Sequence, residues 1–289
     1  MAKKAVLAVE LADIGEIHRL LASGADEIIV PVEGFCFGIA PTGAINEVAR
    51  IVRLAHEAGM KCSAACGKLF AQYELAGLSQ RLQELQQAGV DAIIFQDPAI
   101  IGMCDVPLVF DGMTMPVNAL DAAWWLRHGC ANVVLAPLLE REEILSTLSK
   151  TSCSMQVFGR PILSVSRRKL VSAFEKEASL ATLAGKRSLR LVEEKRAGQM
   201  PVFEGSDHCV VYADFVLDMF QDVARFVEAG LNRLVIGSAF LESSEVLDAV
   251  GAFARILEGN DGGKEREEYA KRHPLVPLER GWLDEKTVR

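Results

Sequence analysis

The sequence predicts a single (β/α)8 barrel, and three observations lead to this fold class. The first is a recurring phrase in which a glycine precedes a short polar turn and an apolar, β-branched run. Such a glycine suits the left-handed residue that ends a helix, and the apolar run is typical of a strand buried on both faces. The second is the number of these strands. The third is the length of 289 residues, which matches one barrel, although it also allows two average domains.

The predicted elements alternate between strands and helices along most of the chain. The expected strands are Ala5–Val9, Glu27–Pro31, Lys61–Ala65, Ala92–Phe95, Leu108–Asp111, Asn132–Leu135, Ser154–Phe158 and Arg233–Ile236. The expected helices are Ile14–Ala22, Ala44–Ala58, Leu78–Ala88, Ala119–His128, Glu140–Ser149, Val216–Ala229 and Ser244–Leu257. Eight strands favour a closed barrel over an open doubly wound sheet, and no G-x-G-x-x-G motif follows the first strand.

One connection is much longer than the others. The barrel is expected over residues 1–259, and the long interval between Gly129 and Gly230 indicates an insertion at 160–212, after the seventh strand. This is the end of a barrel where enzymes of this fold carry their sites. Within the insertion, Ser188–Lys195 and Pro201–Val211 alternate well enough to predict a β-hairpin around residues 196–199.

The tail, residues 260–289, is rich in charge and ends in an apolar, proline-containing segment. Trp282 and Leu283 suggest an extended arm that docks on the barrel or on a partner. A frayed terminus is the alternative.

Positive charge is concentrated in the insertion. The chain has a net charge of −8, which argues against a general nucleic-acid binder, yet residues 150–200 contain eleven Lys or Arg and four Glu. The densest cluster is Arg160, Arg167, Arg168 and Lys169. Arginine suits phosphate or carboxylate, so the cluster could hold an RNA backbone, a small carboxylate-bearing molecule or an acidic partner. A solvated basic face remains the alternative.

The cysteines predict a reducing compartment. There are seven, odd in number, scattered and never in a C-x-x-C pair. Cys62 and Cys66, the nearest pair, would lie about 13 Å apart on a strand, too far to share a metal ion. No metal site is therefore predicted. Without a signal-peptide core or an apolar run long enough to span a membrane, we expect a soluble cytoplasmic protein.

Few side chains are candidates for catalysis. His208 stands beside Asp207, and Asp214 closes the same insertion, so an imidazole and carboxylates could share one loop system and move a proton. A hydrogen bond that stabilises the hairpin is the alternative role of His208. Asp97 follows the fourth strand and could bind a ligand or cap the next segment.

Two amides are candidates for ligand binding. Gln96 ends the fourth strand beside Asp97, and Asn118 follows the fifth strand, where it could equally cap a helix. A peptidase mechanism lacks its usual signals, because no strained Ser or Cys turn and no H-E-x-x-H motif is visible.

Several segments resemble the collagenase-like peptidase family, peptidase family U32. These are Gly-Val-Asp-Ala-Ile-Ile-Phe-Gln-Asp-Pro98, Val-Phe-Gly159 followed by Ser-Arg-Arg168, Pro-Val-Phe-Glu204 with His208 and Asp214, and the tail from Pro277 to Val288. The resemblance is strongest to the short members that accompany a longer paralogue in bacteria. It implies an α/β barrel, with Asn118 and Ser166 at family positions. For the paired members it also implies a part in 5-hydroxylation of the tRNA wobble uridine.

The chain departs from the family pattern where the longer members bind an iron–sulfur cluster. At this point the longer members carry a motif of roughly Val-His-Gly-x-x-Cys, with a second Cys seven residues later. By this resemblance, Phe158 stands here in place of the histidine, and Ile162 and Lys169 stand in place of the two cysteines. The resemblance thus implies no cofactor in this chain and a cluster in the longer partner.

Three functions are therefore open. The leading hypothesis is the small, cluster-free subunit of a tRNA uridine 5-hydroxylation assembly, with a longer cluster-bearing paralogue as partner and tRNA contacted through the shared assembly. A collagenase-like peptidase is the second, and a structural or regulatory barrel without catalysis is the third.

Overall fold

Eight parallel strands form a closed barrel. The structure, a computed structural model, describes residues 5–286 except 12, 39–42, 181, 184 and 195–197. Each strand pairs with its neighbours, and β13 closes the ring by pairing with both β1 and β7. The barrel strands are β1 (Val6–Glu10), β2 (Glu27–Pro31), β3 (Lys61–Cys66), β4 (Ala92–Phe95), β5 (Leu108–Phe110), β6 (Cys130–Leu135), β7 (Cys153–Gly159) and β13 (Leu231–Ile236). All eight predicted strands are confirmed to within one or two residues, and so is the barrel.

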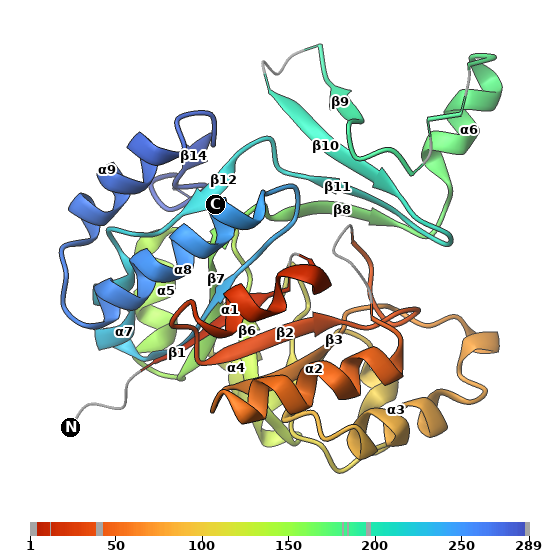
Figure 1. Ribbon diagram of the computed structural model, residues 1–289, viewed down its shortest axis with the longest axis horizontal. Helices are drawn as coiled ribbons and strands as arrows, with labels where there is room; N and C mark the ends of the chain where they lie inside the picture. The colour runs from red at the N-terminus through yellow and green to blue at the C-terminus, as the bar shows by residue number, and fades with distance from the viewer. Residues whose placement is uncertain are drawn as a thin grey trace.

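Helices cover the outside of the barrel (Figure 1). They are α1 (Ile17–Leu21), α2 (Ile45–Glu57), α3 (Leu78–Gln87), α4 (Ala119–Arg127), α5 (Arg141–Leu148), α7 (Val223–Ala229) and α8 (Ser243–Leu257). Three short 3-10 helices, η1 (Ile14–Glu16), η2 (Gln72–Glu74) and η3 (Pro98–Ile100), lie in the connections after β1, β3 and β4. The glycines of the recurring phrase have positive φ, from 75° at Gly59 to 128° at Gly230, as their place after a helix requires.

The hydrophobic core has two layers because successive strand residues face opposite sides of the sheet. One set of strand side chains packs outward against the helices and forms the larger cluster. The other set faces the barrel axis, where a small cluster contains Ala8, Ile29, Ile94, Val109 and Val134. The narrow interior explains why the strands are rich in alanine, valine and isoleucine.

The insertion forms an antiparallel sheet of its own, in the order β8-β11-β10-β9. Its strands are β8 (Ile162–Ser166), β9 (Arg190–Val192), β10 (Gln199–Glu204) and β11 (Cys209–Tyr212), with α6 (Leu170–Glu177) between β8 and β9. Figure 1 shows the sheet beside the barrel, with α6 at its far end. The Glu204 carboxylate accepts hydrogen bonds from the backbone amides of Val171 and Ser172, which fixes the start of α6 against β10.

The hairpin prediction was correct in part. The β9–β10 pair is the predicted hairpin, and its tip at 195–197 lies outside the described residues. The segment Pro201–Val211, expected as one strand, is two strands that turn at Gly205–His208 and pair with each other. The strand β8 and the helix α6 were not predicted, because their partners are distant in sequence.

The predicted helix at Val216–Ala229 is wrong in its first half. Residues Val216–Asp218 form β12, which pairs antiparallel with β7 and parallel with β14 (Leu278–Glu279). These partners lie some sixty residues away on either side, so the local pattern could not indicate a strand. Only α7 is helical.

The tail is not an extended arm throughout, because α9 (Gly262–Arg272) is a helix. Its buried Tyr269 packs edge-on against Phe158, and Leu283 is 3% exposed. Arg141 bonds both Asp222 of the barrel and Asp284 of the tail, at 2.9 and 2.6 Å. The described part of the tail therefore lies on the barrel. Among the described helices, none has the length and apolar character needed to cross a membrane.

A buried ion pair lies inside the barrel. Arg233 on β13 donates two hydrogen bonds to Glu27 on β2, from Nε and Nη2, each 2.8 Å long. Ser63 on β3 donates a further hydrogen bond to the same carboxylate. Burial works against ionisation of Glu27, but the Arg233 guanidinium outweighs it and lowers the pKa of this carboxyl. The pair therefore remains charged within an apolar interior.

Removing one partner should cost far more than removing both. In Arg233→Met the Glu27 charge stays buried without a counter-ion, so we expect the free energy of unfolding to fall by about 3–5 kcal/mol. The double variant Glu27→Leu/Arg233→Met should lose less. Urea unfolding at neutral pH measures both, and a single variant as stable as the double variant would contradict the argument.

Candidate functional site

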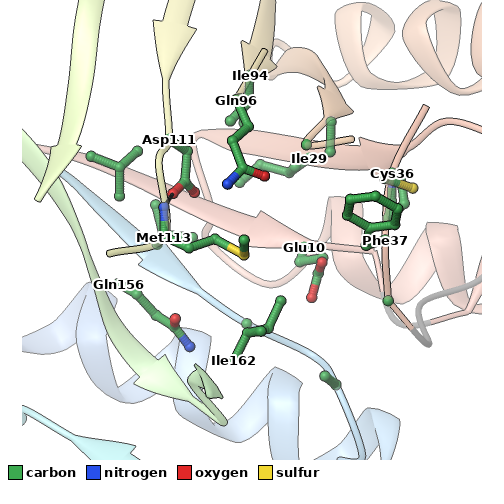
Figure 2. Close-up of a pocket in the computed structure, with 18 of the residues that line it drawn as sticks. Glu10, Ile29, Cys36, Phe37, Ile94, Gln96, Asp111, Met113, Gln156 and Ile162 are labelled. Atoms are coloured by element: carbon green, nitrogen blue, oxygen red, sulfur yellow. Dashed lines mark hydrogen bonds between the residues drawn. The ribbon is translucent and has the colours of Figure 1, made fainter. Parts of the chain in front are cut away.

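A cavity of about 180 Å³ lies at the carboxyl ends of the barrel strands, under the insertion. The strand ends place polar side chains around it: Glu10 from β1, Gln96 after β4, Asp111 after β5 and Gln156 from β7. Figure 2 shows these four side chains around the same central space. The cavity thus occupies the position at which barrel enzymes carry out their chemistry.

The walls of the cavity are mainly apolar. Ile29, Ile94, Val134 and Val235 belong to the inner layer of the barrel and line its floor. Phe37, Ile162 and Tyr212, from the loop after β2 and from the insertion, line the opposite side. Met113 points into the space as well (Figure 2), and its φ of 59° is a strained backbone conformation for a residue with a side chain.

Two carboxyl groups in the cavity resist ionisation. Burial raises the pKa of Glu10, although the backbone amide and hydroxyl of Ser238 each donate a 2.9 Å hydrogen bond to it. Burial also raises the pKa of Asp111, which accepts a 3.1 Å bond from the Met113 amide. Both groups can therefore act as hydrogen-bond donors more readily than an exposed carboxylate.

Three buried polar atoms around the cavity have no hydrogen-bond partner within the described residues. They are Oε1 of Gln96, Nε of Arg160 and Nη1 of Arg233. Arg160 uses another nitrogen to donate to the Ala213 carbonyl at 3.0 Å, and burial, together with Arg190, lowers the pKa of its guanidinium. The cavity therefore presents both unpaired donors and an unpaired acceptor.

Of the residues predicted as site candidates, Gln96 and Arg160 lie in the cavity. Asp97 does not line it: its two oxygens accept bonds from the amides of Ala99 and Phe70, at 2.9 and 2.7 Å, so it caps η3. Asn118 caps α4 by accepting bonds from the amides of Leu120 and Asp121. For these two residues the geometry matches the capping alternative.

The predicted basic cluster is divided. Arg160 is turned into the cavity, whereas Arg167 forms a 2.7 Å ion pair with Glu74 and donates to the Leu69 carbonyl. Ser166 accepts a bond from the backbone amide of Arg168, whose side chain is exposed. The structure therefore brings Arg160 together with Gln96 and pairs Arg167 with Glu74. Arg168 and Lys169 are the exposed part of the cluster outside this ion pair.

His208 belongs to a network that ties the insertion to the barrel. Its Nδ1 lies 3.0 Å from Asp207, and its Nε2 accepts a 3.3 Å bond from the Gly38 amide after β2. Asp207 is also bonded to Lys68 after β3, which forms a 2.7 Å ion pair with Glu74. The Lys68 ammonium and His208 overcome the effect of burial and lower the pKa of Asp207 to about 2.

Asp214 is separate from this network. Its carboxylate lies against Gly198 of the insertion, where a side chain would collide with it, and it is outside the set that lines the cavity. His208 and Asp214 are therefore not brought together as the sequence interpretation proposed.

Sequence reasoning missed Glu10 and Arg233 as site residues. Each is a charged residue within or directly after a buried apolar strand, and such a residue is costly unless it has a role. That signal was available in the sequence. Gln156 carried no comparable signal, since an amide in a strand is common.

Metal ligands are not grouped in the described part of the chain, where no cluster of three or more His, Cys, Asp or Glu is arranged to hold an ion. The seven cysteines are free thiols. Cys36 lines the cavity, and burial, reinforced by Glu10, raises the pKa of its thiol to about 12.

The fold and the site define a class of protein: a single-chain (β/α)8 barrel whose cavity at the strand ends is covered by an inserted antiparallel sheet. The chain belongs to peptidase family U32, whose family model matches residues 12–282.

Two curated relatives are named for hydroxylated RNA. The chain is 24% identical over 245 residues to the tRNA hydroxylation protein P2 of Bacillus subtilis (strain 168), a match that covers 81% of this chain and 79% of the relative. It is 22% identical over 250 residues to a 23S rRNA 5-hydroxycytidine synthase of Escherichia coli (strain K12). That match covers 85% of this chain and 38% of the relative, which is the longer protein.

A solved structure of a U32 peptidase has the same fold. It superimposes with a TM-score of 0.52 at 15% identity, over 83% of this chain and 94% of the other.

Replacing Asp111 by asparagine should stabilise the protein at neutral pH. Because the pKa of Asp111 is raised on folding, the folded protein binds this proton more tightly than the unfolded chain does. Stability is then lost as pH rises from the ordinary aspartate pKa of about 4 through the folded value. Asp111→Asn should therefore melt above the wild type at pH 7, with the difference shrinking towards pH 4.

The matched control for this prediction is Asp105→Asn, at an exposed position. Thermal melts followed by circular dichroism from pH 4 to pH 8 supply the measurement. An Asp111→Asn variant that melts below the wild type at pH 7 would show that the charged form is the stabilising one.

Proposed function

We propose that this chain is the small, cluster-free subunit of an assembly that hydroxylates uridine in tRNA at the 5-position. The observation that carries the proposal is the similarity to the tRNA hydroxylation protein P2, which extends over 81% of this chain and 79% of the relative. A second relative named for hydroxycytidine in rRNA supports RNA as the class of substrate.

The residues at the cluster positions support an accessory role in the redox chemistry. Ile162 carries no ligand atom and lines the cavity, and Lys169 is exposed at the start of α6. Neither is a side chain that ligates iron in clusters, which are held by cysteine thiolates. The electron-transfer chemistry is therefore assigned to a longer, cluster-bearing member of the family.

The peptidase alternative is less well supported by the geometry. Both ring nitrogens of His208 are engaged, with Asp207 and with the Gly38 amide, so the imidazole is not directed at a nucleophile. The thiol in the cavity, Cys36, has a raised pKa and little thiolate at neutral pH. A barrel without any ligand is disfavoured by the three unpaired polar atoms around the cavity.

Deleting the gene should abolish or strongly reduce 5-hydroxyuridine and its derivatives in tRNA, because the assembly would lose a subunit. Nucleoside mass spectrometry of bulk tRNA measures this, and hydroxycytidine in rRNA from the same cells is the internal control. Affinity purification of the tagged full chain should recover a longer paralogue with bound iron. Unchanged hydroxyuridine together with no recovered paralogue would refute the proposal.

Reversing the exposed part of the basic cluster should weaken RNA binding without affecting folding. Arg168→Glu/Lys169→Glu removes cations that are exposed, so we expect a weaker Kd for tRNA and a smaller dependence on salt. Arg50→Glu/Arg53→Glu on α2 is the matched control, with the same change in charge on an outer helix of the barrel. Equal weakening by both variants would mean that only net charge matters.

A further inference from the structure

The unpaired polar atoms around the cavity indicate which hydrogen bonds a ligand bound there would make. An unsatisfied buried donor or acceptor is costly, so several of them around one cavity indicate groups that a bound molecule satisfies. Gln96 directs an acceptor into the space (Figure 2), and Arg233, 5% exposed, has Nη1 left over from its bonds to Glu27. The ligand must therefore both donate and accept hydrogen bonds.

The size and walls of the cavity limit the ligand further. Sites for drug-sized molecules span about 300–1,000 Å³, and the cavity here has about 180 Å³. Its floor is a ring of aliphatic side chains, and Phe37 and Tyr212 stand on the side of the insertion. Such walls suit a small flat ring whose faces are apolar and whose edge is polar.

The charges around the cavity favour a neutral ligand. Arg233 is balanced by Glu27, and Arg160 is the remaining cation of the lining, whereas Glu10 and Asp111 are acids. A ligand with several negative charges would have Arg160 as its single unbalanced counter-charge in the lining. A ring edge with alternating donors and acceptors would instead bond to Gln96, to the acids and to Arg233.

We propose that this cavity receives one pyrimidine base of the RNA, turned out of its strand, and reads the hydrogen-bonding edge of the base. Enzymes that modify a base commonly extrude it into a snug pocket of this kind. The inference rests on the proposed function and adds a division of labour, in which the cluster-free chain holds the base and the partner supplies the redox centre.

Gly67 offers a way to close the cavity without disturbing the fold. It lines the cavity, a Cβ built there meets no atom within 4 Å, and its φ is outside the range that only glycine tolerates. Gly67→Phe should therefore fill the cavity, whereas Gly67→Ala adds one methyl group and is the matched control. Gln96→Leu removes the unpaired acceptor at nearly constant volume.

The experiment uses the full chain and a short RNA hairpin with a single 5-fluorouridine in its loop. The bound hairpin should show a displaced and broadened fluorine resonance with the wild type and with Gly67→Ala. With Gly67→Phe and Gln96→Leu the resonance should stay near its free position. Fluorescence anisotropy should show the Kd of the hairpin changed by no more than about threefold, because phosphate contacts supply most of the affinity.

Several results would overturn the inference. The inference fails if the wild type does not displace the fluorine resonance, or if Gly67→Phe displaces it as far as the wild type does. It also fails if the hairpin does not bind with or without the longer paralogue. Malonate tests the alternative of a small carboxylate. If malonate raises the melting temperature of wild type but not of Gly67→Phe, and the fluorine resonance is not displaced, the cavity is an anion site.

Failure of this inference can be told apart from failure of the proposed function. If Gly67→Phe restores hydroxyuridine to the deletion strain as fully as the wild-type gene does, the cavity does not hold the base, yet the chain still belongs to the assembly. If deletion leaves hydroxyuridine unchanged and no longer paralogue is recovered, the proposed function fails, and the fluorine experiment still decides whether the cavity binds a base.

Discussion

The rest of the barrel depends on the buried ion pair between Glu27 and Arg233. These residues stand on the strands to either side of β1, so the pair can form only when β13, β1 and β2 are in register. An isolated charge at this depth would be costly, and the pair thereby specifies how the ring closes. Arg233 also lines the cavity, and its Nη1, which Glu27 does not use, is one of the unpaired donors there.

Much of the fold could be predicted because its signals are local. A glycine after each helix and an apolar run after each glycine are read within about ten residues, and they gave the barrel strands almost to the residue. The strands β8, β12 and β14 depend instead on partners far away in sequence. Val216 pairs with Leu278, and Leu217 with Gly159, contacts that no short window of sequence contains.

The candidate site was predicted less well, and the reason is geometric. Alternate residues face opposite sides at the end of a strand, so Gln96 enters the cavity while Asp97 turns away to cap η3. Proximity along the chain suggested that Arg160 and Arg167 act together, yet one enters the cavity and the other bonds to Glu74. Glu10 could have been found, because a carboxylate that ends a buried apolar strand is costly unless it has a role.

The short link between β7 and β8 connects the inside of the barrel to its outer surface. Arg160 lies on this link, Ile162 begins β8, and both line the cavity, while β8 leads directly to the exposed Arg168 and to α6. An occupant of the cavity would therefore contact the same segment that leads to the outer surface. If the occupant shifts this segment, the two sites are coupled, and a molecule on the outer surface then changes the affinity of the cavity by the same factor as the occupant changes the affinity of the surface.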